Sequence, residues 1–189
     1  MIRFKLKQQN ILDFDIENRP LSYWIPDRPT AEVTAIAWSW EGSYQVQCEL
    51  LTPREHSMVD MLVMFKQAYN HADIVTGHYI RRHDLPIING AMVENGLTPL
   101  KPKLTSDTKL DLIKWKDLPQ SQEYLGEMFG IAAPKVNMSQ HAWREANRLS
   151  EAGQEATETR VKADVIQHKL LRRTLVAEGL LKPPRVWQP

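Results

Sequence analysis

Two acidic side chains, separated by one residue, follow a short apolar run near the start of the chain. The run extends from Ile11 to Ile16, and the acids are Asp15 and Glu17. A run of this kind is typical of a buried strand, and side chains two residues apart on a strand point to the same face. Two neighbouring carboxylates repel each other unless a positive charge lies between them. The pair therefore suits a hard cation such as Mg²⁺, which prefers carboxylate oxygen.

The pattern alone leaves other interpretations open. Asp13 shares the face of Asp15 and Glu17, so spacing does not show which of the three acids take part. All three would also be accounted for by a strand that ends in solvent.

Two further acids lie at element boundaries far along the chain. Asp84 follows a short apolar strand expected over residues 73–79 and precedes Leu85, where a helix closed by Gly96 should begin. It could serve only as the N-cap of that helix. Asp164 lies at the core-facing edge of a final helix expected over residues 158–179, where an acid needs a partner or a metal. Two metal ions about 3.5–4 Å apart can cleave phosphodiesters, and such a site draws carboxylates from several segments.

Basic residues accompany these acids. Arg81 and Arg82 precede Asp84, and Lys162 lies two residues before Asp164. Positive patches beside a metal site often meet phosphates, so these three residues are candidates for substrate binding. Spacing alone would equally fit a solvated loop and a solvated helix face.

The elements that position these residues form an alternating pattern. Strands are expected over residues 11–16, 33–40 and 44–51, followed by a helix capped by Thr52 with Pro53 in its first position. A last short strand is expected over 108–115 and a helix over 122–129, whereas 132–157 is interpreted as loop plus weak helix. Prolines at 20, 26 and 29 mark a loop. The order predicts an α/β fold with a mixed sheet of about five strands and helices on both faces.

Composition is that of an ordinary soluble domain. The 189 residues carry a formal net charge of only +1, so phosphate contacts must come from a local patch rather than from bulk charge. Cys48 is the only cysteine, which excludes an intrachain disulfide and fits a reducing cytoplasm. No apolar run approaches the length of a membrane span. We expect one domain over residues 1–181 and a proline-rich tail over 182–189.

The acidic segments, taken in order, resemble the three exonuclease motifs of the DEDD superfamily, the DnaQ-like exonucleases. Asp15-Ile16-Glu17 resembles its Asp-x-Glu motif, the segment from His78 to Asp84 resembles the second motif, and Asp164 matches the last acid. The resemblance selects the acids that flank Ile16 and so leaves Asp13 out. In detail the pattern is most similar to the exonuclease domain of family B DNA polymerases, here free-standing.

The resemblance implies a ribonuclease H-like fold and a two-metal-ion site for Mg²⁺ or Mn²⁺. The four acids would be catalytic and would bind both ions, and the expected activity is 3′–5′ hydrolysis of single-stranded DNA that releases mononucleotides. DNA, single-stranded or at its 3′ ends, is the expected partner, with RNA and replication proteins as further candidates. An exoribonuclease of the same fold and a catalytically impaired nucleic-acid-binding module of a replication complex remain alternatives.

One feature of the family is missing. The family carries a Tyr four residues, or a His five residues, before the last acid, whereas this chain has Arg160 and Thr159 there. Neither can take a proton from water near neutral pH. His168, His141 or no side chain at all could fill the role of general base, and His168 could instead be a buried histidine bonded to a neighbour.

Overall fold

A six-stranded mixed sheet forms the centre of the protein. The computed structural model describes residues 9–20, 31–113, 119–133 and 136–189. The strands lie in the order β3-β2-β1-β4-β5-β6; their bounds are β1 Ile11–Pro20, β2 Ala31–Trp40, β3 Gln47–Leu50, β4 Ile74–Gly77, β5 Lys103–Asp107 and β6 Arg185–Trp187. β1, β2 and β3 are antiparallel, β1, β4 and β5 are parallel, and β6 is antiparallel to β5. The expected ribonuclease H-like α/β fold is thereby confirmed.

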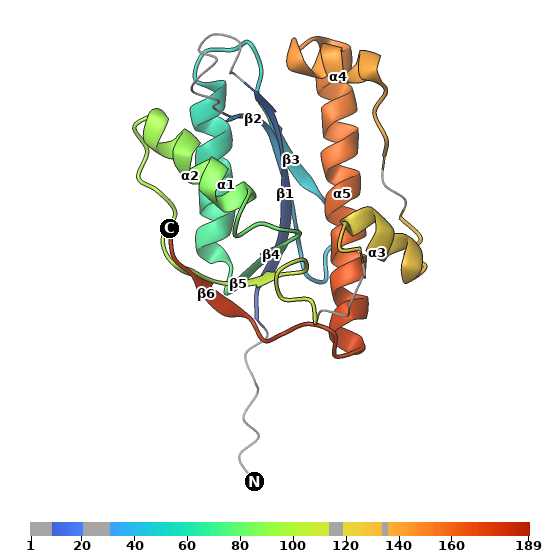
Figure 1. Cartoon of the computed structure of the whole chain (residues 1–189). Coiled ribbons are helices and arrows are strands. Elements are labelled where there is room, and N and C mark those ends of the chain that lie inside the picture. The colour runs from blue at the N-terminus through green and yellow to red at the C-terminus, as the bar shows by residue number, and fades with distance from the viewer. Residues whose placement is uncertain (1–8, 21–30, 114–118, 134–135) are drawn as a thin grey trace.

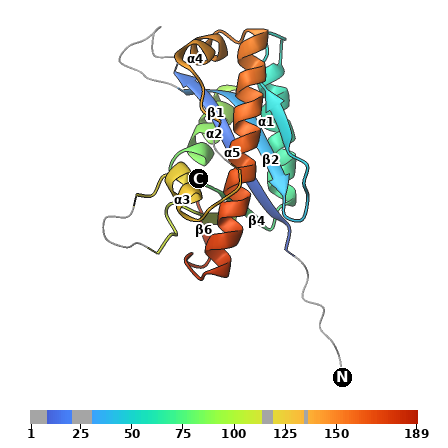
Figure 2. The ribbon, with the colours of Figure 1, turned by 90° about the vertical axis from the view of Figure 1, so that its right-hand side faces the viewer.

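Helices cover both faces of the sheet (Figure 1). Their bounds are α1 Ser57–His71, α2 Asp84–Glu94, α3 Gln122–Met128, α4 Gln140–Asn147 and α5 Glu151–Ala177. α1 and α2 lie on one side, whereas α5 runs along the other with α4 beside its first turns and α3 beside its second half (Figure 2). No described helix is long and apolar enough to cross a membrane.

Alternation along β2 divides the core between the two faces. Ile36 and Trp38 belong to the large cluster that includes the buried side chains of α1 and α2. Ala35 and Ala37 point the other way and pack with Val161 and Val165 of α5. Small side chains on that face allow α5 to approach the sheet closely, which brings the strand and helix acids together.

Several element boundaries differ from expectation. α1 begins at Ser57, not at Thr52, because the Ser57 hydroxyl accepts the Thr52 N–H at 2.9 Å and donates to a strand carbonyl. The strand expected over 108–115 lies instead at 103–107. It ends there because the Asp107 carboxylate accepts N–H groups of the next turn. Residues 114 and 115, like prolines 26 and 29, lie outside the described residues.

The last helix is longer than its apolar pattern predicts. α5 begins at Glu151, with the Ser150 hydroxyl accepting the Gly153 N–H. Gly153 packs so closely on α4 that a Cβ there would lie 2.2 Å from the Glu145 carbonyl. Within the segment 132–157, expected to be loop plus weak helix, residues 140–147 and 151–157 are therefore two packed helical pieces. Residues 185–187 of the proline-rich tail pair with β5, so this part of the tail adds a strand to the sheet.

Candidate active site

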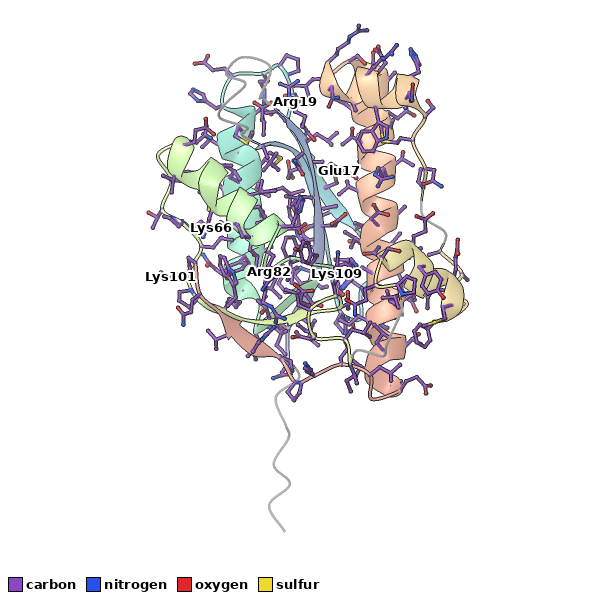
Figure 3. The ribbon with its side chains drawn as sticks, viewed as in Figure 1. Glu17, Arg19, Lys66, Arg82, Lys101 and Lys109 are labelled. Atoms are coloured by element: carbon purple, nitrogen blue, oxygen red, sulfur yellow. The ribbon has the colours of Figure 1, made fainter. Side chains whose placement is uncertain are left out.

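Three of the four acids selected from the sequence converge between β1 and α5. Asp15, Glu17 and Asp164 each offer a carboxylate oxygen, and these oxygens all lie within 4.8 Å of one another. Asp164 is 5 % exposed, and the two strand acids are half-buried. Glu17 lies on the part of β1 that faces α5 (Figure 3).

Local packing explains how β1 presents these acids. In the β1–β2 pair Asp15 lies opposite Ala37 and Glu17 opposite Ala35. Residues opposite each other in an antiparallel pair share a face, so the acids stand beside alanines in the space under α5. The register shifts directly after Glu17. Pairing continues beyond the shift to Pro20, and such an irregularity can re-aim side chains beside functional sites.

The fourth acid, Asp84, is the first residue of α2 and is 2 % exposed. It is not the N-cap, because His83 occupies that position. The Asp84 carboxylate lies 3.3 Å from His83 Nδ1. That contact raises the pKa of His83 above 6.5, so the imidazole favours its charged form. Asp84 approaches the cluster from the α2 side without belonging to the three acids within 4.8 Å.

The cluster concentrates negative charge in a place with little water. Burial, together with the charges of Asp84, Asp164 and Glu17, raises the pKa of Asp15 well above its ordinary value of 3.8. These interactions connect all four acids electrostatically. A cation bound among them would remove the repulsion.

β1 and α5 face each other along two matched rows of charged groups. Asp13 continues the row of Asp15 and Glu17, and on α5 the side chains at 160, 164, 168 and 172 recur at one-turn spacing. Asp13 is fully buried and is bonded to Arg172, at 2.8 and 2.9 Å, with His168 Nδ1 3.1 Å away. Asp13 is therefore matched by cationic partners, whereas Asp15 lies among acids.

Arg160 extends the helix row into the cluster. Its Nε donates to Glu17 at 2.6 Å, and its Nη2 lies 3.6 Å from an Asp164 oxygen. The position at which the family carries its base thus holds a permanent cation in contact with two site acids. Arg160 is one turn before Asp164, so its closeness could have been inferred from helical spacing, although its contact with Glu17 could not.

A cavity of about 300 Å³ opens over the acids. Its lining includes His78, His83, Lys109 and Gln122 as well as Asp15, Glu17, Arg160 and Asp164. The Lys109 ammonium lies 4.2 Å from the centre of the Tyr79 ring. Sequence reasoning missed Lys109, because its segment was interpreted as a strand.

One buried carboxylate holds the two loops that line this cavity. Asp107 accepts the N–H of Tyr79 at 3.0 Å, of Arg81 at 3.1 Å and of Lys109 at 3.1 Å. Tyr79 has a left-handed backbone conformation with a φ of 72°, which is unfavourable for a residue with a Cβ. The Asp107 contacts stabilise this conformation and thereby fix the loop that leads to Asp84.

The three basic residues chosen as substrate contacts lie in different settings. The Arg81 side chain is 7 % exposed and forms a two-point ion pair with Asp111, at 2.9 and 2.5 Å. Lys162 pairs with Glu158 on a part of α5 about 200° around the axis from Asp164. Arg82 is exposed (Figure 3). Of the three, Arg82 alone has both exposure and a place on the cavity loop.

The two histidines considered as general bases do not line the cavity that opens over the acids. His168 is 1 % exposed and is turned toward Asp13. This matches the alternative of a buried histidine bonded to a neighbour. His141 is exposed on α4 and is not among the residues that line the cavity.

The donors fit a small hard cation. Ligands on opposite sides of a Mg²⁺ ion lie about 4.2 Å apart, as follows from octahedral distances of about 2.0–2.1 Å. Adjacent ligands lie about 2.9 Å apart by the same geometry, so the three oxygens, which lie within 4.8 Å of one another, would draw closer around a bound ion. Every donor is a carboxylate oxygen, and oxygen sites favour Mg²⁺ or Mn²⁺ over softer metals.

Comparison with known proteins identifies a similar fold but no family. No family model matches the chain, and no curated protein matches it. Among solved structures, the fold is similar to that of the family B DNA polymerase from the hyperthermophilic archaeon Pyrobaculum calidifontis, with a TM-score of 0.62 and 18% sequence identity. The match covers 89% of this chain and 24% of the polymerase chain, so this chain spans about a quarter of that protein.

Proposed function

We propose that this chain is a metal-dependent 3′–5′ exonuclease that hydrolyses the terminal phosphodiester of single-stranded DNA. The observation that carries the proposal is the convergence of Asp15, Glu17 and Asp164 within 4.8 Å in a ribonuclease H-like fold, with Asp84 close enough to raise the pKa of Asp15. The acids come from β1, α2 and α5, in the order of the DEDD motifs that the sequence resembles. The fold similarity to a family B DNA polymerase supports the same interpretation.

The acids would hold divalent cations of the Mg²⁺ or Mn²⁺ class. Such ions lower the pKa of water and stabilise negative charge on a leaving oxygen. The resemblance implies two ions, although Arg160 already contacts two of the four acids.

The residues of the chain would bind and orient the strand end. Lys109 lines the cavity and Arg82 is exposed on its loop, so both are placed to contact phosphates of the substrate. Asp107 would act indirectly, by fixing the loops that carry these two side chains.

A nuclease assay on the purified chain tests the proposal. A 5′-labelled single-stranded DNA oligonucleotide should shorten stepwise from its 3′ end with Mn²⁺ and remain intact with chelator. Asp15→Asn and Asp164→Asn should lose activity by about 10³-fold or more. Asp60→Asn, which changes an exposed acid paired with Arg54, should be unaffected. Metal-dependent cleavage by Asp15→Asn at the wild-type rate, or no cleavage by the wild type, would refute the assignment.

A matched RNA oligonucleotide in the same assay separates a deoxyribonuclease from an exoribonuclease.

The position of Arg160 favours one further candidate, a module that binds DNA without cleaving it. Binding of the labelled strand with Mn²⁺ but without shortening would select that candidate.

A further inference from the structure

The Arg160 guanidinium is enclosed on several sides within the acidic cluster. It donates to Glu17 at 2.6 Å and to the Val136 carbonyl at 2.7 Å, and it lies 3.6 Å from Asp164. The ring of Trp143 covers it, with 5.2 Å between the guanidinium carbon and the ring centre. The Arg160 side chain is only 12% exposed. Contacts from β1, α4, α5 and the segment before α4 thus fix its place.

A cation so placed competes with a metal ion for the same oxygens. A guanidinium stays protonated at all accessible pH values, so its charge is permanent. Two metal ions in a nuclease site lie about 3.5–4 Å apart and share carboxylates. Arg160 contacts one oxygen of each carboxylate, Oε1 of Glu17 and Oδ2 of Asp164, so one ion can approach the second oxygen of each. A second ion that shared these carboxylates would have to displace Arg160 or would lie against its positive charge.

The charge of the site balances without a second ion. The four acids carry −4 when ionised. One divalent ion, Arg160 and Lys109, which lines the same cavity, together carry +4, and a protonated His83 in the same lining adds further positive charge. Two divalent ions alone would bring the same +4, and two ions added to both basic side chains would leave a surplus of +2.

We propose that the site binds one divalent cation and that Arg160 supplies the positive charge that a second ion would bring. The inference rests on the proposed function, since it concerns the metal site of that reaction. Arg160 then has two effects. It holds Glu17 and Asp164 in position before metal binds, and it limits the site to a single ion.

The number of bound ions tests this inference without an activity measurement. Mn²⁺ alone is titrated into the full chain, with calorimetry for the stoichiometry and electron paramagnetic resonance for coupling between ions. Wild type should bind one Mn²⁺ with the spectrum of an isolated ion. Arg160→Gln should bind two, with the altered spectrum of a coupled pair. Arg148→Gln makes the same change at an exposed arginine of the same region, 72% exposed, and should bind one.

The outcomes separate the inference from the proposed function. Two tightly bound ions in wild type would overturn the role of Arg160 and leave the metal-dependent nuclease standing. No bound ion in wild type would overturn both. One ion in Arg160→Gln, with a circular dichroism spectrum equal to wild type, would also overturn the inference. If Arg160→Gln does not fold, the wild-type stoichiometry still tests the single-ion site, because two bound ions would overturn it.

Discussion

Arg172 and Asp13 form a buried ion pair directly beside the acidic cluster, with Nε 2.8 Å from Oδ1 and Nη2 2.9 Å from Oδ2. Arg172 also bonds Glu41, which Arg173 contacts in turn. Asp13 shares the strand face of Asp15, yet its charge is offset within the fold. The same β1–α5 contact thus contains a neutralised pair at Asp13 and concentrated acids at Asp15.

Asp13→Asn should destabilise the fold strongly. Breaking a buried ion pair from one side costs up to about 3–5 kcal/mol, and here the buried Arg172 would keep only the half-buried Glu41 as its partner. Burial opposes ionisation of Asp13, but hydrogen bonds from His168 and Arg172 outweigh it and lower its pKa below 3.8. Its contribution to stability is therefore present above pH 3.8 and lost as pH falls through the lowered pKa. Urea unfolding at pH 7 measures the loss.

The exposed pair of Asp60 with Arg54 provides the control for that measurement. Asp60→Asn should cost at most about 1 kcal/mol, as exposed pairs usually do. Equal unfolding midpoints for the two variants would show that the Asp13 pair does not stabilise the fold.

Asp15→Asn should have the opposite effect on the metal-free protein. Burial and the charges of Asp84, Asp164 and Glu17 raise the pKa of Asp15, so its ionisation opposes folding. Its stabilising contribution is complete below pH 3.8 and is lost as pH rises through the raised pKa. At pH 7 with chelator, Asp15→Asn should melt a few degrees above wild type, since about 1 kcal/mol shifts Tm by about 2–4 °C at this size.

Added Mn²⁺ should reverse the order of the two melting temperatures, so that wild type melts above Asp15→Asn. Wild type should gain thermal stability with metal concentration, because an ion that binds only the folded state stabilises it. Asp15→Asn should gain little. A lower melting temperature for metal-free Asp15→Asn than for wild type would contradict the repulsion among the four acids.

The sequence predicted the placement of the candidate acids better than their surroundings. Strand alternation and helix spacing are local, so they placed Asp15, Glu17 and Asp164 on inward faces. Asp13 shows the limit, because its partner Arg172 lies 159 residues away and no local pattern reveals that pair. The same holds for the Arg160 contact with Glu17, which depends on how α5 crosses β1.

The predicted ends of helices and strands were wrong where side-chain hydrogen bonds to the backbone fix the real ends. The Ser57 hydroxyl delays the start of α1, and the Asp107 carboxylate ends β5. Strand β6 could not be read from the three prolines of the tail, because its pairing with β5 is a tertiary contact.

Substitution of Arg82 should affect substrate binding, whereas substitution of Arg81 should affect the stability of the fold. Arg82→Gln should weaken binding of single-stranded DNA and lower the slope of log K against log salt by about 1, as loss of one phosphate contact predicts. Arg81→Gln should instead lower stability by up to about 3–5 kcal/mol, because the buried Asp111 would keep only the Asp107 N–H and the exposed Arg185 as partners. Fluorescence anisotropy over a salt series and urea unfolding measure the two effects. A lower salt slope in a fully stable Arg81→Gln would place Arg81 on the substrate instead.

The last prediction concerns the missing base. Arg160 cannot take a proton from water, His168 is turned to Asp13, and His141 is exposed outside the cavity. We therefore expect the cleavage rate to rise with pH well above 7, because hydroxide becomes more abundant, and to be higher with Mn²⁺ than with Mg²⁺. His141→Ala should retain activity within about tenfold, which is less than the loss of 10²–10⁴-fold expected for a general base.

His168→Ala should lose stability rather than rate, so its activity is compared at a temperature at which it is folded. His83 is the informative third variant, because it lines the cavity and its contact with Asp84 raises its pKa. Initial rates between pH 6 and 9.5 for the three alanine variants decide the question. If one of them loses about 10²-fold or more and its rate no longer follows pH as in wild type, that histidine is the base, and hydrolysis without a side-chain base is excluded.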